Sequence, residues 1–201
     1  MRTKYFYWHF SSGLSEKEIN KIKEIASKSG YLSGVTRKDD LSENDDDIEY
    51  RDSEVSFSED SRLYDILCPF VFAANESAGW NYDIDWFEKV QIAKYSENQH
   101  YAWHNDGGSD IHGSYTDEGG FKGKVRKLSL VSILSDKYIG GDLEFSIQDN
   151  DKENVFNEVL KPDLGIGDII VFPSYVYHRS TQIKKGTKYS ATMWCLGFPF
   201  K

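Results

Sequence analysis

The chain of 201 residues has the length of one domain, and its 39% hydrophobic and 15% aromatic residues suffice to bury a core, which excludes a wholly disordered protein. Its formal net charge of -9 disfavours non-specific binding to nucleic acid, because phosphate groups repel an acidic surface. The two cysteines, Cys68 and Cys195, are too few for a secreted disulfide scaffold or a zinc site made of CxxC pairs, so we expect reduced thiols in the core.

The sequence shows no signal for export or membrane insertion. No apolar run approaches the length of a transmembrane helix, and residues 1–10 lack the apolar segment of a signal peptide. We therefore expect a soluble, cytoplasmic protein without a membrane partner.

The N-terminal part predicts a strand followed by a helix. The aromatic segment Tyr5–Phe10 is typical of a strand. A capping box from Ser15 to Glu18, with apolar residues at helical spacing behind it, predicts a helix over 15–29 that ends at Gly30.

A second helix is expected over 62–77, where apolar residues again recur at helical spacing. Pro69 leaves two alternatives open, a kink within this helix or a helix that begins at Pro69. The segment 37–52 before it is strongly acidic, and we interpret it as a solvated loop rather than a calcium site, because it lacks the spaced ligands and glycine of an EF-hand. A short strand is expected over 54–57.

From Trp86 onward the pattern becomes that of β structure. Segments rich in Val, Ile, Leu and aromatic residues, separated by glycines, predict strands. They cover 87–95, 127–134, 143–145, 168–172 and 188–196. The stretch 107–126 is rich in Gly, Ser, Asp and Lys and predicts a long loop.

Helices first and many short strands later predict an α+β protein that is mainly β, a double-stranded β-helix (jelly roll) with supporting helices packed outside it. We expect residues 1–201 to form a single domain, with helical support over about 15–80 and the jelly-roll core over about 86–198.

The main candidate for a metal site is the segment His104-Asn105-Asp106. Side chains alternate along a strand, so positions 104 and 106 point to the same side. His178 is the only histidine after His112 and completes a triad of two imidazoles and a carboxylate, which leaves three octahedral positions free at Fe(II). Each residue alone has a structural explanation, as a core histidine, a turn aspartate and a surface histidine. His112 is the alternative third ligand.

Ten residues after His178, Lys188 begins an alternating pattern with Ser190, Thr192 and Trp194 that puts all four on one strand face. A cation buried in a barrel requires an anionic partner, and a dicarboxylate co-substrate supplies one. We expect Lys188 to pair with its distal carboxylate, and Ser190 or Thr192 to add a hydroxyl group.

From residue 86 to the C-terminus, the order and spacing of the motifs resemble the prolyl 4-hydroxylase-type family of 2-oxoglutarate- and Fe(II)-dependent oxygenases. The motifs are, in chain order, Tyr95, His104-x-Asp106, Gly140-Gly141-Asp142-Leu143-x-Phe145, Gly165-x-Gly167-Asp168, Phe172-Pro173, His178 and Lys188-Tyr189-Ser190. H-x-D alone is a weak motif, but a distal histidine and a basic residue ten positions later make the combination specific.

The resemblance implies a role for each matching residue. His104, Asp106 and His178 match the iron ligands, Lys188 and Tyr95 match the groups that hold 2-oxoglutarate, and Trp194 matches an aromatic residue near the metal. The sequence departs from the family at Asn98-Gln99, where many relatives have Gly-Gln. The acidic segment 37–52 and the loop 107–126 have no clear counterpart, so the resemblance does not define the substrate.

The implied reaction is hydroxylation of a prolyl residue or a related amino-acid side chain, with O2 and 2-oxoglutarate consumed, succinate and CO2 released, and ascorbate keeping the iron reduced. The implied partner is a peptide or a small amino-acid-like molecule. A nucleic-acid demethylase of the same chemistry is disfavoured by the acidic charge. A non-enzymatic jelly-roll binding module is the other alternative, and it has no need of a buried lysine ten residues after His178.

Overall fold

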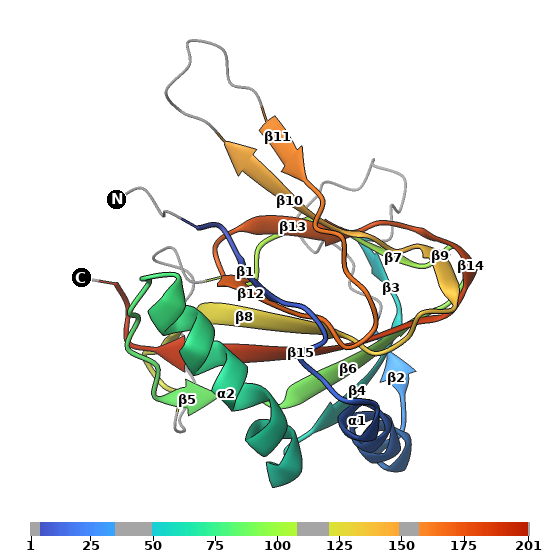
Figure 1. Cartoon of the computed structure of the whole chain (residues 1–201), viewed down its shortest axis with the longest axis horizontal. Helices are drawn as coiled ribbons and strands as arrows, with labels where there is room; N and C mark the ends of the chain where they lie inside the picture. The colour runs from blue at the N-terminus through green and yellow to red at the C-terminus, as the bar shows by residue number, and fades with distance from the viewer. Residues whose placement is uncertain (1–4, 35–49, 108–120, 149–156, 201) are drawn as a thin grey trace, which may run out of the picture.

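Two facing antiparallel sheets dominate the computed structural model (Figure 1), which describes residues 5–34, 50–107, 121–148 and 157–200. The strands of the larger sheet are β1 (Trp8–Phe10), β2 (Leu32–Ser33), β4 (Glu54–Ser58), β5 (Trp86–Phe87), β6 (Val90–Tyr95), β8 (Val125–Ile133), β12 (Ile169–Pro173) and β15 (Lys188–Gly197). Their order in the described chain is β1-β12-β8-β15-β6-β4-β2, with β5 paired to β15.

The smaller sheet lies across from the larger one and carries two of the candidate metal ligands. Its strands are β3 (Arg51–Asp52), β7 (His100–His104), β10 (Leu143–Gln148), β11 (Asn157–Leu160) and β13 (Tyr177–Ser180). They are ordered β11-β10-β13-β7-β3, and a separate pair joins β9 (Tyr138–Gly140) to β14 (Ile183–Gly186). The predicted mainly-β jelly roll is confirmed.

The first helix, α1 (Glu16–Ser29), begins and ends as the sequence predicts. The hydroxyl oxygen of Ser15 accepts a hydrogen bond from the Glu18 backbone N–H, and the Glu18 carboxylate accepts one from the Ser15 backbone N–H at 2.8 Å. Gly30 ends the helix with a φ of +78°, a conformation that costs glycine little. The capping box therefore fixes the start of this helix.

The second helix, α2 (Ser61–Ser77), runs through Pro69 rather than beginning at it, so the second alternative is wrong. Its start is set by Asp60, whose carboxylate accepts from the backbone N–H of Arg62 at 3.1 Å. Leu63 and Leu67 precede Pro69 and Val71 follows it, and all three are fully buried on one face. This packing compensates for the hydrogen bond that proline cannot donate.

Both helices cover the face of the larger sheet that points away from the smaller sheet (Figure 1). The main apolar core lies between them and that face, and includes Ile22 and Leu67 from the helices and Ile92, Leu128 and Met193 from the sheet. The expectation that the helices pack outside the barrel is confirmed, and the space between the sheets is left for a more polar cavity.

Several of the predicted strands and loops begin or end at residues other than those predicted. The predicted opening strand is ordered as a strand only over β1, and the predicted strand 87–95 is divided into β5 and β6. The last two residues of the predicted acidic loop form β3, and the last two of the predicted loop 107–126 begin β8. Residues 37–49 of the acidic loop and most of the other loop lie outside the described residues.

Both cysteines carry free thiols, with Cys195 buried and Cys68 half-buried, as predicted. Among the described residues, no helix is long and apolar enough to cross a lipid bilayer.

Candidate metal centre

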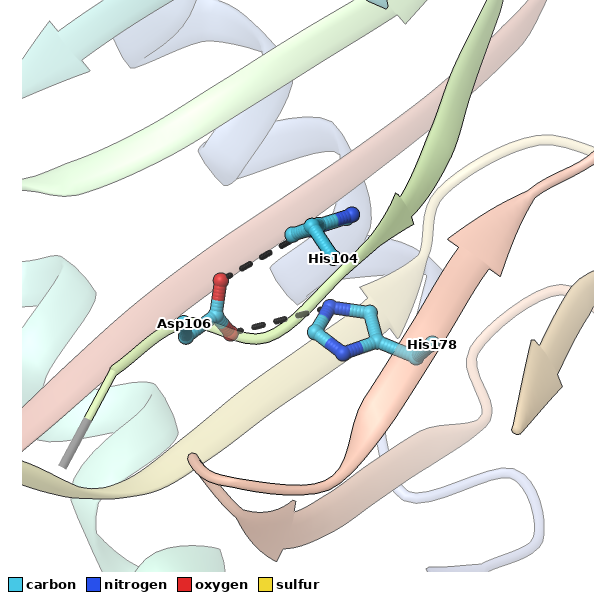
Figure 2. Close-up of side chains that lie close together, drawn as sticks. All are labelled: His104, Asp106 and His178. Atoms are coloured by element: carbon cyan, nitrogen blue, oxygen red, sulfur yellow. Dashed lines mark ion pairs between the residues drawn. The ribbon is translucent and has the colours of Figure 1, made fainter. Parts of the chain in front are cut away.

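His104 and His178 lie directly opposite each other on the neighbouring strands β7 and β13. Their ring centroids are 4.1 Å apart, and both side chains are buried. Figure 2 shows the two rings converging on the carboxylate of Asp106. Pairing of β7 with β13 therefore brings together two histidines that are 74 positions apart in the sequence.

Asp106 lies just beyond the end of β7 and still points to the same side as His104. Its Oδ1 is 3.8 Å from Nε2 of His104, and its Oδ2 is 3.7 Å from Nε2 of His178. The backbone N–H of Asp106 donates to the carbonyl oxygen of Ser174 at 2.9 Å, and the Ser129 hydroxyl donates to Oδ2 at 2.6 Å. Hydrogen bonds, not strand pairing, hold this ligand in place.

The same backbone interaction orients both imidazoles. Nδ1 of His104 lies 2.8 Å from the carbonyl oxygen of Ala102, and Nδ1 of His178 lies 2.9 Å from that of Val176. A carbonyl oxygen accepts only, so Nδ1 carries the proton in each ring. The Nε2 lone pairs are consequently free and face Asp106.

The electrostatics favour a neutral His104 beside an ionised Asp106. Burial, and next the proximity of His178, lower the pKa of His104 to about 4. Burial alone would raise the pKa of Asp106, but the two histidines, Arg126 and the Ser129 hydroxyl outweigh it and hold that pKa below its usual range. A neutral imidazole at His104 and an ionised carboxylate at Asp106 are therefore the expected species at pH 7.

This donor set fits a divalent transition metal. One ligand atom from each of His104, Asp106 and His178 can be chosen so that all lie within 4.8 Å of one another, and they are buried at the wall of one cavity. Two neutral imidazole nitrogens and a carboxylate oxygen are the ligands preferred by non-haem Fe(II), and the open side of the cavity leaves room for further ligands.

Lys188 is the second notable charge in the cavity. Only 3% of its surface is exposed, and its Nζ donates to the carbonyl oxygen of Gly141 at 2.6 Å and to the Ser180 hydroxyl at 3.3 Å. Burial lowers the pKa of Lys188 to about 8, although Asp142 acts in the opposite direction. Within the described chain no carboxylate lies at ion-pair distance from Nζ, so its two acceptors are neutral.

The other residues predicted to hold the co-substrate face the same cavity. Tyr95 pairs with Lys188 across β6 and β15, and burial raises the pKa of its hydroxyl. The described residues that line the cavity are Gln91, Tyr95, Tyr101, His104, Asp106, Val131, Leu143, His178, Ser180, Lys188, Ser190, Thr192 and Trp194. The structure thus brings together all eight candidate site residues.

Tyr101 is a cavity residue that the sequence patterns did not identify. It stacks on His104 with ring centroids 3.6 Å apart and an angle of 16° between the planes. Three positions separate the two residues, which would place them on opposite faces of a regular strand. The register shifts here, because β7 advances by three residues from Tyr101 to His104 while β13 advances by two from Ser180 to His178.

Arg51 is a second buried cation near the cavity and was also missed. Its Nε donates to the Ser53 hydroxyl at 2.9 Å, and its guanidinium lies over the ring of Tyr101 at 4.7 Å. Its Nη2 is buried without a hydrogen-bond partner among the described residues. An arginine at the edge of an acidic segment gives no sequence signal of burial.

The arginines nearer the sequence motifs are already paired. Arg126 forms an ion pair with Glu88 at 2.6 Å and lies over the ring of Trp194 at 4.1 Å. Arg179 is paired with Glu144 at 2.7 Å. Lys188 and Arg51 are therefore the cations near the cavity that lack a carboxylate partner in the described residues.

The remaining histidines are not part of the triad. Nε2 of His9 lies at hydrogen-bond distance, 3.0 Å, from Oδ2 of Asp168, and Asp168 also accepts from the backbone N–H groups of Ser12 and Gly165, so both residues are structural. His100 begins β7, away from the cluster. His112 lies outside the described residues.

Asn98, where many members of the resembling family have glycine, lies in a turn. Asn98 has a φ of +70°, which asparagine tolerates better than most residues other than glycine. The backbone of the turn is thus compatible with Asn at this position, and none of the three candidate ligands lies in it.

Comparison with protein families gives a match over residues 90–196 to the 2OG-Fe(II) oxygenase superfamily. No curated protein sequence matches the chain significantly.

Solved structures resemble the fold over nearly its whole length. The viral collagen prolyl hydroxylase of Paramecium Bursaria Chlorella virus-1 is 20% identical, with a TM-score of 0.65 over 96% of this chain and 97% of that one. A prolyl-4-hydroxylase of Pseudomonas putida is 14% identical, with a TM-score of 0.67 over 96% and 92%. A prolyl hydroxylase of Trichoplax adhaerens, in complex with a peptide fragment of hypoxia inducible factor, is 16% identical, with a TM-score of 0.65 over 96% and 84%.

Proposed function

Because the chain belongs to the 2OG-Fe(II) oxygenase superfamily, we propose that it is a dioxygenase that uses Fe(II) and 2-oxoglutarate to hydroxylate a prolyl residue or a related amino-acid side chain. The observation that carries this proposal is the pairing of two features in one cavity. A buried His-Asp-His cluster lines the cavity, and so does Lys188, whose buried ammonium has no carboxylate partner in the described residues.

We assign Fe(II) to His104, Asp106 and His178. Their free Nε2 lone pairs and carboxylate converge, and the backbone carbonyls at Nδ1 keep the rings in the orientation that binding requires. When bound, Fe(II) and 2-oxoglutarate supply the activation of O2, with succinate and CO2 as the co-products. The protein needs no general base for this reaction class.

We assign the distal carboxylate of 2-oxoglutarate to Lys188. A buried ammonium whose partners are a carbonyl and a hydroxyl is a costly arrangement that an incoming carboxylate improves. Tyr95 lies opposite Lys188, and Ser190 and Thr192 follow it on the same face of β15. These three hydroxyl groups are additional donors for the co-substrate.

We place the substrate against Trp194 and Tyr101. The indole N–H of Trp194 is buried without an acceptor among the described residues, so it is available to a carbonyl or carboxylate oxygen of a ligand. The amino-acid substrate class is suggested by the prolyl hydroxylases of similar fold, one of which is solved with a peptide. A peptide is therefore the first substrate to test.

The test is a succinate-release assay. Anaerobically purified protein is given Fe(II), 2-oxoglutarate and ascorbate, which we propose as the reductant that keeps the iron ferrous, and then O2. The candidate substrates are proline-containing peptides, the same peptides with Ala in place of Pro, and free amino acids. We expect succinate formation to depend on a proline-containing peptide, and the product to gain one oxygen atom in mass spectrometry.

The matched controls are two histidine variants of the same strand. His104→Ala should abolish succinate formation, and His100→Ala, which changes a β7 residue outside the cluster, should preserve it. Equal activity of the His104→Ala variant and the wild type would overturn the assignment of the metal ligands. Succinate formation with free amino acids alone would correct the substrate class.

A further inference from the structure

Two serines lie directly beneath the carboxylate of Asp106. Ser129, on β8, and Ser174, in the turn after β12, are both completely buried. The Oγ of Ser129 is 2.6 Å from Oδ2 of Asp106 and 2.9 Å from Oγ of Ser174. Neither serine is part of the cavity lining described above, so any role must act through Asp106.

The direction of this hydrogen-bond chain follows from the number of protons. An ionised carboxylate only accepts, so the single hydroxyl proton of Ser129 is directed at Oδ2. The oxygen of Ser129 then accepts the hydroxyl proton of Ser174. The chain of hydrogen bonds therefore runs from Ser174 through Ser129 to Asp106. The hydroxyl group of Ser174 donates to Ser129, and that of Ser129 donates to Asp106.

Ser174 also fixes the backbone around the site. Its carbonyl oxygen accepts from the N–H of Asp106 at 2.9 Å, and its own N–H donates to the carbonyl of Lys127 at 3.0 Å. Two residues later, the carbonyl of Val176 accepts from the imidazole of His178. This short turn therefore holds two of the three candidate metal ligands.

From this geometry we infer that Ser129, supported by Ser174, is a positioning residue that fixes the rotation of the Asp106 carboxylate and makes it a one-oxygen ligand of the metal. The hydrogen bond occupies Oδ2, and Oδ1 remains without a side-chain hydrogen bond among the described residues. A carboxylate that bound through both oxygens would take one of the three positions needed for the co-substrate and O2. This inference rests on the proposed metal assignment.

The test measures metal binding rather than turnover. Mn(II) affinity is determined by calorimetry, and the coordination number is followed through the absorption spectrum of the Co(II)-loaded protein. Removing a hydrogen bond to a metal ligand typically weakens metal binding about 10–100-fold, which is the loss expected for Ser129→Ala. The Co(II) spectrum of this variant should also change, because the carboxylate is free to turn.

Three further variants separate positioning from simple loss of a buried hydroxyl group. Ser129→Thr keeps the hydroxyl and should retain strong metal binding, and Ser174→Ala should fall between Ser129→Ala and the wild type. Ser132→Ala is the matched control, because Ser132 lies on the same strand, is fully buried and has no hydrogen-bond partner in the described residues. Its metal affinity and Co(II) spectrum should be those of the wild type.

The outcomes are distinguishable. If the wild type binds Mn(II) and Ser129→Ala binds it equally well with the same Co(II) spectrum, the role of Ser129 is overturned and the metal site stands. An equal loss in Ser129→Ala and Ser132→Ala also overturns it, because packing alone then explains the effect. If the wild type binds neither metal, both this inference and the proposed function fail.

Discussion

At the scale of single residues, Lys188 offers the most direct prediction. Its ammonium is buried beside two neutral acceptors, and a bound dicarboxylate would give it a charged partner. Leaving that carboxylate buried and unpaired costs on the order of 3–5 kcal/mol. Lys188→Ala should therefore weaken 2-oxoglutarate binding by about two to three and a half orders of magnitude, at about 1.4 kcal/mol for each factor of ten.

This prediction is checked by titrating 2-oxoglutarate into the anaerobic Fe(II) protein and following the metal-to-ligand charge-transfer absorbance. Iron binding should survive, since no metal ligand is changed. Lys127→Ala is the control, because Lys127 is also a buried lysine but lies over the ring of Phe200 and outside the cavity. Unchanged affinity in Lys188→Ala would transfer the role to Arg51.

The same lysine predicts a pH dependence. Burial lowers the pKa of Lys188 to about 8 in the ligand-free protein, and the co-substrate binds the protonated form. Affinity should thus be constant well below pH 8 and fall about tenfold for each pH unit above it, because binding then requires uptake of a proton.

The matched variant for this prediction is Lys188→Arg, whose guanidinium stays protonated throughout that range. Its affinity is expected to be lower than that of the wild type at pH 7 but to show no decline from pH 8 to 9.5. The measurement is the same anaerobic titration, repeated across the pH range. A decline of equal slope in both proteins would assign the titration to another group.

Residue patterns predicted the cavity in part. Alternation on one strand correctly grouped Lys188, Ser190, Thr192 and Trp194, because β15 is regular over these positions. Arg51 was not predicted, since its guanidinium lies over the ring of Tyr101, a distant contact that no local pattern encodes. Local sequence patterns do not identify residues whose contacts form only when the chain folds.

At the scale of elements, helix α2 contains a proline, which cannot donate a backbone hydrogen bond inside the helix. Pro69 is exposed and lies eight positions after the first residue of the helix. Pro69→Ala restores a backbone N–H in the helix interior and removes no buried contact, so it should stabilise the protein by about 1–3 kcal/mol. Denaturant unfolding of the two proteins measures the difference.

The control for this substitution is Glu76→Ala, which lies on the exposed side of the same helix and leaves its hydrogen bonding intact. This change should shift stability by much less than 1 kcal/mol, as is usual for exposed positions. A loss of stability in Pro69→Ala would show that the proline contributes through a bend in the helix that the packing requires.

The elements that the sequence predicted well are those whose signals are local. The capping box of α1 and the apolar face of α2 lie within single turns or faces of a helix. Two of the register shifts between strands are different, because each depends on a partner strand. One brings Tyr101 beside His104, and the other, between Cys195 and Leu196 on β15, changes the pairing where Arg126 meets Trp194. Strict alternation could not predict either.

At the scale of the whole molecule, the helices and the larger sheet share one core. Ile22 of α1 and Leu67 of α2 are fully buried against strands that also carry the cavity residues on their other face. A change in the support helices therefore bears on β15, which holds Lys188, and on β8, whose Ser129 hydrogen-bonds Asp106. We propose on this basis that the chain behaves as a single folding unit.

The proposal predicts that helices and barrel unfold together. Far-ultraviolet circular dichroism, which reports the helices, and tryptophan fluorescence, which includes Trp194 in the cavity lining and Trp103 next to His104 on β7, should give the same denaturant midpoint. Leu67→Ala should lower that midpoint for both probes, because deleting a fully buried leucine side chain typically costs about 2–5 kcal/mol. Adding Mn(II) and 2-oxoglutarate at a hundred times their dissociation constants should raise the midpoint for both probes. Each ligand should increase the free energy of unfolding by about 2.7 kcal/mol. Two separate transitions, with only the fluorescence transition responding to the ligands, would instead show that the helices unfold independently of the site.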